Sequence, residues 1–190
     1  MADPPETRPQ PQADSPSVPR TYRSLFLGLA AAWFVLDQVT KTWAENTLAI
    51  RNIDIVGSFR LNLAYNTGSA FSFGGGLGPW IALLALVVVG VLVWHGRTVS
   101  TRLGAVAMGM IVGGALGNVA DRAFRSDAGF MRGAVIDFFD LQWWPIFNVA
   151  DVGIVVGGIL LVVSSFRTPE PAPPSDGADV SSSPPDGEVR

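Results

Sequence analysis

The sequence of 190 residues contains no cysteine and only one histidine, His95. The lack of cysteine excludes disulfides, thiolate nucleophiles and zinc sites built on cysteine. His95 ends an apolar segment, and its neighbours in the sequence offer no partner for acid–base or metal chemistry. Any catalysis must therefore depend on other side chains, and we expect neither a metal nor a cofactor.

The chain also has little net charge. Its formal charge is −3, from 13 lysines and arginines against 16 aspartates and glutamates, and much of the acid lies in the C-terminal tail. A charge so small and dispersed does not favour a polyanionic partner. We therefore do not expect the protein to bind nucleic acid.

Long apolar runs are abundant, since 48% of the residues are hydrophobic. Residues 77–94 and 103–120 contain no charged side chain, and each run is long enough to cross a bilayer as a helix. We predict a mainly α-helical membrane protein whose domain, residues 24–166, has four transmembrane helices, a small extracytoplasmic β-sheet and a periplasmic or extracellular loop over the functional site. The predicted spans are about 24–43, 77–95, 103–123 and 147–166.

The two ends of the chain differ from this domain. Residues 1–23 and 167–190 are rich in proline and polar residues, and we predict that they are disordered tails. The first apolar run starts near Leu25 and is predicted to remain as a membrane anchor rather than a cleaved signal. The short loop with Arg97 and Arg102 has no acid, which favours a cytoplasmic loop and two cytoplasmic termini. The rule is not decisive, because basic residues also occur in the predicted outer segments.

Residues 44–76 have a different pattern. Short β-prone runs occur at 53–56, 59–63 and 70–73, with turn residues between them, and predict a small sheet on the membrane surface. Asn66 and Gly68 stand between the last two runs. Because glycine allows close approach of another backbone, a peptide or inhibitor could lie against this phrase, although an ordinary turn explains it as well.

Polar residues gather at the ends of the predicted spans. Asp37 and Lys41 are four residues apart and could form an ion pair inside the membrane, or could simply end the helix at the interface. Ala105, Gly109, Gly113 and Gly117 form a row of small residues that predicts close helix packing. Two further polar groups follow at helical spacing: Asn118, Asp121 and Arg122 end the third span, and Asn148 and Asp151 begin the fourth.

If the third and fourth spans are antiparallel neighbours, the loop 124–147 returns Asp137 to the level of Asp151. Two carboxylates brought close together tend to share one proton. Such a pair can activate water for peptide hydrolysis, as in aspartic proteases. The spacing leaves alternatives open: a proton-coupled transporter or channel, a scaffold with structural ion pairs, or a serine–lysine protease that uses Lys41 with Ser69 or Ser72.

Five short sequence motifs, called phrases here, favour one of these alternatives. They are FVLDQVTK at 34–41, AYNTGSAFS at 64–72, GGALGNVADR at 113–122, VIDF at 135–138 and PIFNVADV at 145–152. Together, over about residues 25–166, they resemble the signal peptidase II family of bacteria. The resemblance implies an aspartic endopeptidase of the bacterial cytoplasmic membrane. Such an enzyme removes the signal peptide of diacylglyceryl-modified prolipoproteins by cleavage before the lipidated cysteine, at the outer face.

The resemblance also implies roles for single residues. The catalytic pair falls on Asp137 and Asp151. Supporting or substrate-binding positions fall on Asp37, Lys41, Asn66, Gly68, Asn118, Asp121, Arg122 and Asn148. Asp121 beside Arg122 suggests a structural or substrate-orienting pair, although Asp121 is also a rival for one catalytic place. Membrane lipid and globomycin-type peptide inhibitors are the other implied partners, and Asp140 is an additional acid near the pair.

Overall fold

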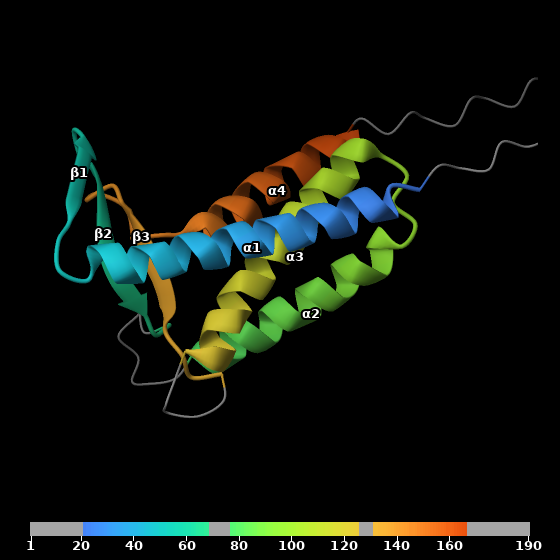
Figure 1. Ribbon diagram of the computed structural model, residues 1–190. Helices are drawn as coiled ribbons and strands as arrows, with labels where there is room; N and C mark the ends of the chain where they lie inside the picture. Colours follow the sequence, from blue (N-terminus) through green and yellow to red (C-terminus); the bar gives the residue numbers. More distant parts are fainter. Residues whose placement is uncertain (1–20, 69–76, 126–130, 167–190) are drawn as a thin grey trace, which may run out of the picture.

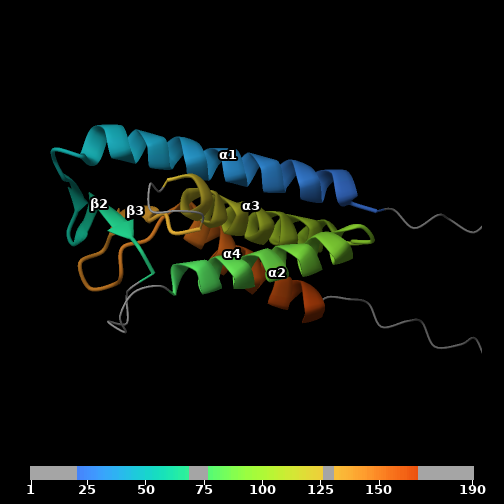
Figure 2. The same ribbon diagram turned by 90° about the horizontal axis from the view of Figure 1, so that it is seen from below.

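The computed structural model describes residues 21–68, 77–125 and 131–166. Four helices lie lengthwise beside one another, and a small sheet covers one end of them (Figures 1 and 2). The helices are α1 (Arg23–Leu48), α2 (Gly78–Gly96), α3 (Arg102–Phe124) and α4 (Val149–Phe166). Helix α1 begins and α4 ends at the end opposite the sheet (Figure 1). The predicted tails lie almost wholly outside the described residues.

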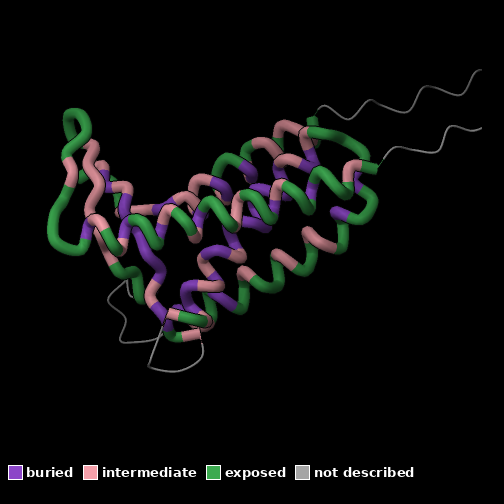
Figure 3. The backbone as a smooth tube through the Cα atoms, viewed as in Figure 1, coloured by how far each residue is buried: buried purple, intermediate pink, exposed green. Residues whose placement is uncertain are grey.

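Helix α3 is the centre of the bundle, since it contacts each of the other three helices and is buried along most of its length (Figure 3). The row of small residues explains this close contact. A side-chain carbon on Gly109 would lie 2.9 Å from Cβ of Leu29, and one on Gly113 would lie 2.8 Å from Cβ of Trp33. The predicted packing surface of small residues is therefore confirmed, and it faces α1.

Helix α4 also depends on a glycine for its contact with α1. The ring of Trp33 lies against Gly153, and its Nε1 donates a hydrogen bond of 3.1 Å to the carbonyl oxygen of Val149. A side-chain carbon on Gly153 would lie 2.7 Å from Cδ1 of that ring. The indole therefore cannot move away from Gly153 without losing its hydrogen bond to Val149 at the start of α4.

We expect Gly153→Ala to destabilise the protein by about 1–3 kcal/mol, the usual cost of overpacking a tight contact. Gly158 on the same helix is the matched control, because nothing lies within 4 Å of a side-chain carbon there. Gly158→Ala should be neutral or stabilising by up to about 1 kcal/mol, since alanine is the better helix former. Thermal unfolding of both variants in one detergent measures the difference, and equal melting temperatures would contradict the packing argument.

Three helices in the described part of the chain, α2, α3 and α4, are long and apolar enough to cross a membrane. The outer faces of α2 and α4 expose large apolar side chains, among them Leu84, Val87, Val155 and Val162. Such faces suit contact with lipid rather than water. Helix α1 does not meet the same criterion, and it runs on to Leu48, past the predicted end near residue 43. Its added turn places Ala44 and Leu48 beneath the sheet.

The sheet is antiparallel, with the strand order β1 (Ile53–Val56), β2 (Phe59–Asn66), β3 (Val135–Asp140). The first two strands confirm two of the predicted runs, although β2 continues to Asn66. The third strand lies in the segment 124–147, which we expected to be a loop, while the predicted run 70–73 lies outside the described residues. Strand β3 forms because Ile136 and Phe138 are buried against the end of α1.

Candidate active site

Asp137 lies in β3 and is 3% exposed. The strand register places it opposite Ala64, two residues before Asn66 of β2. Asn66 Nδ2 donates to Asp137 Oδ2 at 3.1 Å, and Asn148 Nδ2 donates to Oδ1 at 2.7 Å. Gly68, which has a φ of +80°, donates its backbone N–H to Asn66 Oδ1. This turn leaves the NH₂ group of Asn66 facing the carboxylate.

Asp151 stands in the first turn of α4. Asn148 precedes this helix, and the two residues cap it reciprocally: the backbone N–H of Asn148 donates to Asp151 Oδ2, and that of Asp151 donates to Asn148 Oδ1. This is the arrangement of a capping box. Asn118 of α3 donates from Nδ2 to Asp151 Oδ1 at 2.9 Å. Asn148 therefore contacts both carboxylates, one through its side chain and one through its backbone.

A buried lysine lies behind Asn118. Lys41 Nζ is 2.8 Å from each of Asp37 Oδ2, Asp121 Oδ2 and Asn118 Oδ1, and the side chains of the two acids and the lysine are fully buried. The predicted Asp37–Lys41 ion pair is thus present. An ammonium group only donates, so the oxygen of Asn118 must face Lys41 and its NH₂ group must face Asp151.

The same contacts bear on the serine–lysine alternative. All three N–H donors of Lys41 have acceptors, and two of these are carboxylates. The base of a dyad must reach the serine hydroxyl, whereas every N–H of Lys41 points to one of these three acceptors. The two candidate serines, Ser69 and Ser72, lie outside the described residues. The geometry of Lys41 therefore favours a structural role.

Asp121 and Arg122 do not form the expected pair. Asp121 faces α1 and β3, where it binds Lys41, Arg125 and the backbone N–H of Ile136. Among the described residues, Nε and Nη1 of Arg122 are buried without a hydrogen-bond partner. Successive residues of a helix point about 100° apart, so these two side chains lie on different sides of α3. The predicted pair is therefore wrong.

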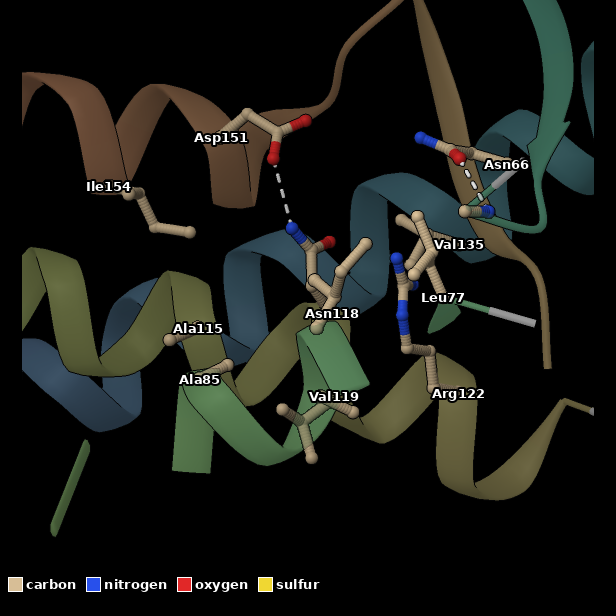
Figure 4. A pocket seen from close by; sticks show the side chains of 13 residues that line it. Asn66, Leu77, Ala85, Ala115, Asn118, Val119, Arg122, Val135, Asp151 and Ile154 are labelled. Carbon is tan, nitrogen blue, oxygen red and sulfur yellow. Dashed lines mark hydrogen bonds between the residues drawn. The ribbon is translucent and has the colours of Figure 1, made fainter. Parts of the chain in front are cut away.

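Arg122 instead lines a cavity of about 550 Å³ between α2, α3 and α4, which we call the polar cavity (Figure 4). Asn66, Asn118 and Asp151 lie at its polar end with Arg122. The remaining lining residues are mostly small or apolar, among them Leu77, Ile81, Ala82, Ala85, Ala115, Val119, Val135 and Ile154. The cavity can therefore take a chain that is apolar along most of its length and polar at one end.

Burial and charge change the acidity of Asp137. Burial raises its pKa first, and the neighbouring charge of Asp151 raises it further, to about 6. The carboxyl of Asp137 therefore holds a proton at mildly acidic pH. Asp140, three residues further along β3, differs: a hydrogen bond from Arg60 lowers its pKa, and its carboxylate binds Arg60 and Asn62.

Two supporting residues were missed from the sequence. Gln38 donates to Asp121 Oδ1 and to the carbonyl oxygen of Gly117. Arg125 links Asp121 to Glu45 of α1. The spacing of four residues between Asp121 and Arg125 is a signal for a helical ion pair that could have been used. No group of three His, Cys, Asp or Glu side chains among the residues described here is placed to hold a metal.

The fold and the site define the class: a helical membrane protein in which a buried carboxylate, Asp137, and a half-buried one, Asp151, lie beside a mostly apolar cavity. A family model described as Signal peptidase (SPase) II matches residues 29–167. The chain belongs to the signal peptidase II family.

Curated relatives agree with this, and a solved structure shares the fold. The lipoprotein signal peptidase of Mycolicibacterium smegmatis is 41% identical over 87% of this chain and 76% of its own. That of Mycobacterium leprae is 44% identical over 78% and 74%, and that of Rhodococcus jostii is 42% identical over 85% and 83%. A bacterial membrane enzyme solved at 1.9 Å shares the fold, with a TM-score of 0.66 over 77% of this chain and 96% of that one, at 23% identity.

Proposed function

We propose that this protein is an aspartic endopeptidase that removes the signal peptide of diacylglyceryl-modified prolipoproteins by cleaving before the lipidated cysteine. Membership of the signal peptidase II family supports the reaction class. The observation that carries the assignment of residues is the double contact of Asn148. This one residue holds Asp137 by its side chain and Asp151 by its backbone, and so fixes the two carboxylates relative to each other, with Asp151 lining the polar cavity.

In the proposed hydrolysis, Asp137 starts with a proton and acts as the acid, and Asp151 acts as the base. Asp151 takes a proton from a water molecule, and the resulting hydroxide attacks the carbonyl carbon of the scissile bond. Asp137 gives its proton to the carbonyl oxygen, which forms a neutral tetrahedral intermediate. Collapse of the intermediate breaks the C–N bond: Asp151 gives its proton to the leaving nitrogen, and Asp137 takes back the proton of the hydroxyl that becomes the new carbonyl. Arg122 and Asn118 offer donors for peptide carbonyls in the polar cavity, where the signal segment would lie.

We further propose that α1 is a fourth span and that the sheet lies at the outer face of the bacterial cytoplasmic membrane. The charged residues that lower the hydropathy of α1 include Asp37 and Lys41, which are buried as a pair and hidden from lipid. Aromatic residues near both ends of the bundle, Tyr22 and Trp94 at one and Trp143 and Trp144 at the other, suit the two membrane interfaces. Both termini would then be cytoplasmic.

The test is cleavage of a synthetic prolipoprotein peptide by the purified protein in detergent, with and without the diacylglyceryl group on its cysteine. We expect one cut, before the lipidated cysteine, and a much slower reaction without the lipid. A globomycin-type peptide inhibitor should compete with this substrate, because it would occupy the polar cavity. The appearance of ion flux in liposomes with no peptide product would favour the transporter alternative instead.

The pH dependence tests the shared proton. Because the pKa of Asp137 is raised to about 6, the singly protonated pair is lost as the pH rises through that value, and kcat/KM should fall above about pH 6. Asn66 donates to the ionised form of Asp137 and so lowers its pKa. Asn66→Leu should therefore move the descending limb of the kcat/KM–pH profile to higher pH, by about one unit. A limb that stays in place, or moves to lower pH, would contradict the assignment.

A further inference from the structure

A second cavity meets the site at Asp151. It has a volume of about 430 Å³ and lies on the other side of α4, between that helix and the segment after β3. We call it the outer groove. Apart from Asp151, it is lined by Leu141, Trp143, Trp144, Phe147, Val152, Val155 and Val156. Asp151 is therefore the residue that borders both the polar cavity and the outer groove.

Hydrogen bonds hold the wall of the outer groove in place. Gln142 has a φ of +66°, and its backbone N–H donates to Asp140 Oδ1 at 2.7 Å while its side chain donates to the carbonyl of Ser58. Phe147 pairs its backbone with Phe139 by hydrogen bonds of 2.8 and 3.1 Å. These bonds tie both ends of the segment that carries Trp143 and Trp144 to the sheet. This explains the additional acid, Asp140, as an anchor of the wall.

The two cavities differ in chemistry. The polar cavity offers side-chain donors from Asn66, Asn118 and Arg122, whereas every side chain of the outer groove except Asp151 is apolar or presents an aromatic ring. A peptide backbone in the outer groove would leave its N–H and C=O groups without partners, which is costly away from water. A hydrocarbon chain has no such groups. Val155 is 60% exposed and Val156 37%, so on a spanning helix the groove is open to lipid from the side.

We propose that the outer groove binds an acyl chain of the diacylglyceryl cysteine of the substrate. This inference rests on the proposed function. The scissile bond joins the signal segment to the lipidated cysteine, so a bond held at Asp151 has the signal segment on one side and the lipid on the other. The polar cavity takes the peptide and the outer groove takes the hydrocarbon. The groove thereby makes cleavage depend on acyl-chain length.

The experiment compares two substituted proteins on two substrates. Val155→Trp fills the outer groove, and Val162→Trp is its matched control, because Val162 lies seven residues further on α4 and is 58% exposed. The substrates are one peptide with an S-dipalmitoylglyceryl or an S-dibutyrylglyceryl cysteine, in the same detergent. The natural protein should prefer the long chains. Val155→Trp should lose about tenfold in kcat/KM on the long-chain substrate alone, and Val162→Trp should match the natural protein on both.

Unchanged cleavage of the short-chain substrate shows that Val155→Trp is folded and that its carboxylate pair still works. An equal loss on both substrates would overturn the proposal, because the substitution would then act through Asp151. A natural protein with no preference for long chains would overturn it too, as would equal losses in the two tryptophan variants. If the natural protein cleaves neither lipidated substrate, the proposed function itself fails and this inference fails with it.

Discussion

Asparagine in place of Asp137 or Asp151 is expected to lower the rate of prolipoprotein cleavage by about 10³-fold or more. A general acid and a general base each contribute about 10²–10⁴-fold, and asparagine can neither give nor take the proton. Asp137 and Asp151 each accept hydrogen bonds through both carboxylate oxygens. An asparagine offers one acceptor, so each variant also loses one of these bonds.

The measurement is single-turnover cleavage of the lipidated peptide by the purified variants, with thermal unfolding as the check on folding. Asp54→Asn is the matched control, because Asp54 is an exposed carboxylate in β1 of the same sheet. It should keep the full rate. Asp121→Asn should retain measurable cleavage, since Asp121 binds Lys41 and Arg125 on the far side of α3. Normal turnover by a folded Asp137→Asn or Asp151→Asn protein would remove that residue from the pair.

The second large effect is expected at Lys41. Methionine fills a similar volume but leaves the carboxylates of Asp37 and Asp121 buried without their shared cation. Breaking a buried ion pair by removing one partner costs about 3–5 kcal/mol. Asn118 would also lose the donor that fixes its amide, so its NH₂ group would no longer be held toward Asp151. We therefore expect Lys41→Met to melt at a much lower temperature and to cleave slowly.

Arg60 provides the comparison for Lys41. It also forms an ion pair at 2.8 Å, with Asp140, but its side chain is 33% exposed. Ion pairs in contact with water are worth about 0–1 kcal/mol, so Arg60→Met should change stability little. Thermal unfolding in the same detergent ranks the two variants. If Lys41→Met and Arg60→Met have the same melting temperature, the buried ion-pair network does not stabilise the bundle.

Several features were predictable because they depend on residues close together in the chain. A run such as 103–120 is apolar without interruption, and that alone predicts a long buried or spanning helix. Asp37 and Lys41 are one helical turn apart, so their ion pair needs only the helix to form. The capping of α4 by Asn148 and Asp151 is likewise local. The five phrases that resemble signal peptidase II added the family, which the comparisons confirm.

The features that sequence reasoning missed depend on contacts between distant segments. The sequence by itself determined the four helices, the first two strands and the polar residues at the helix ends, because spacing within one segment fixes these. Only the tertiary structure decided that β3 pairs with β2, since Tyr65 and Ile136 must meet from far apart in the chain. It also decided that Asp121 turns to Lys41 and not to Arg122, because α1 packs on one side of α3 and the polar cavity opens on the other.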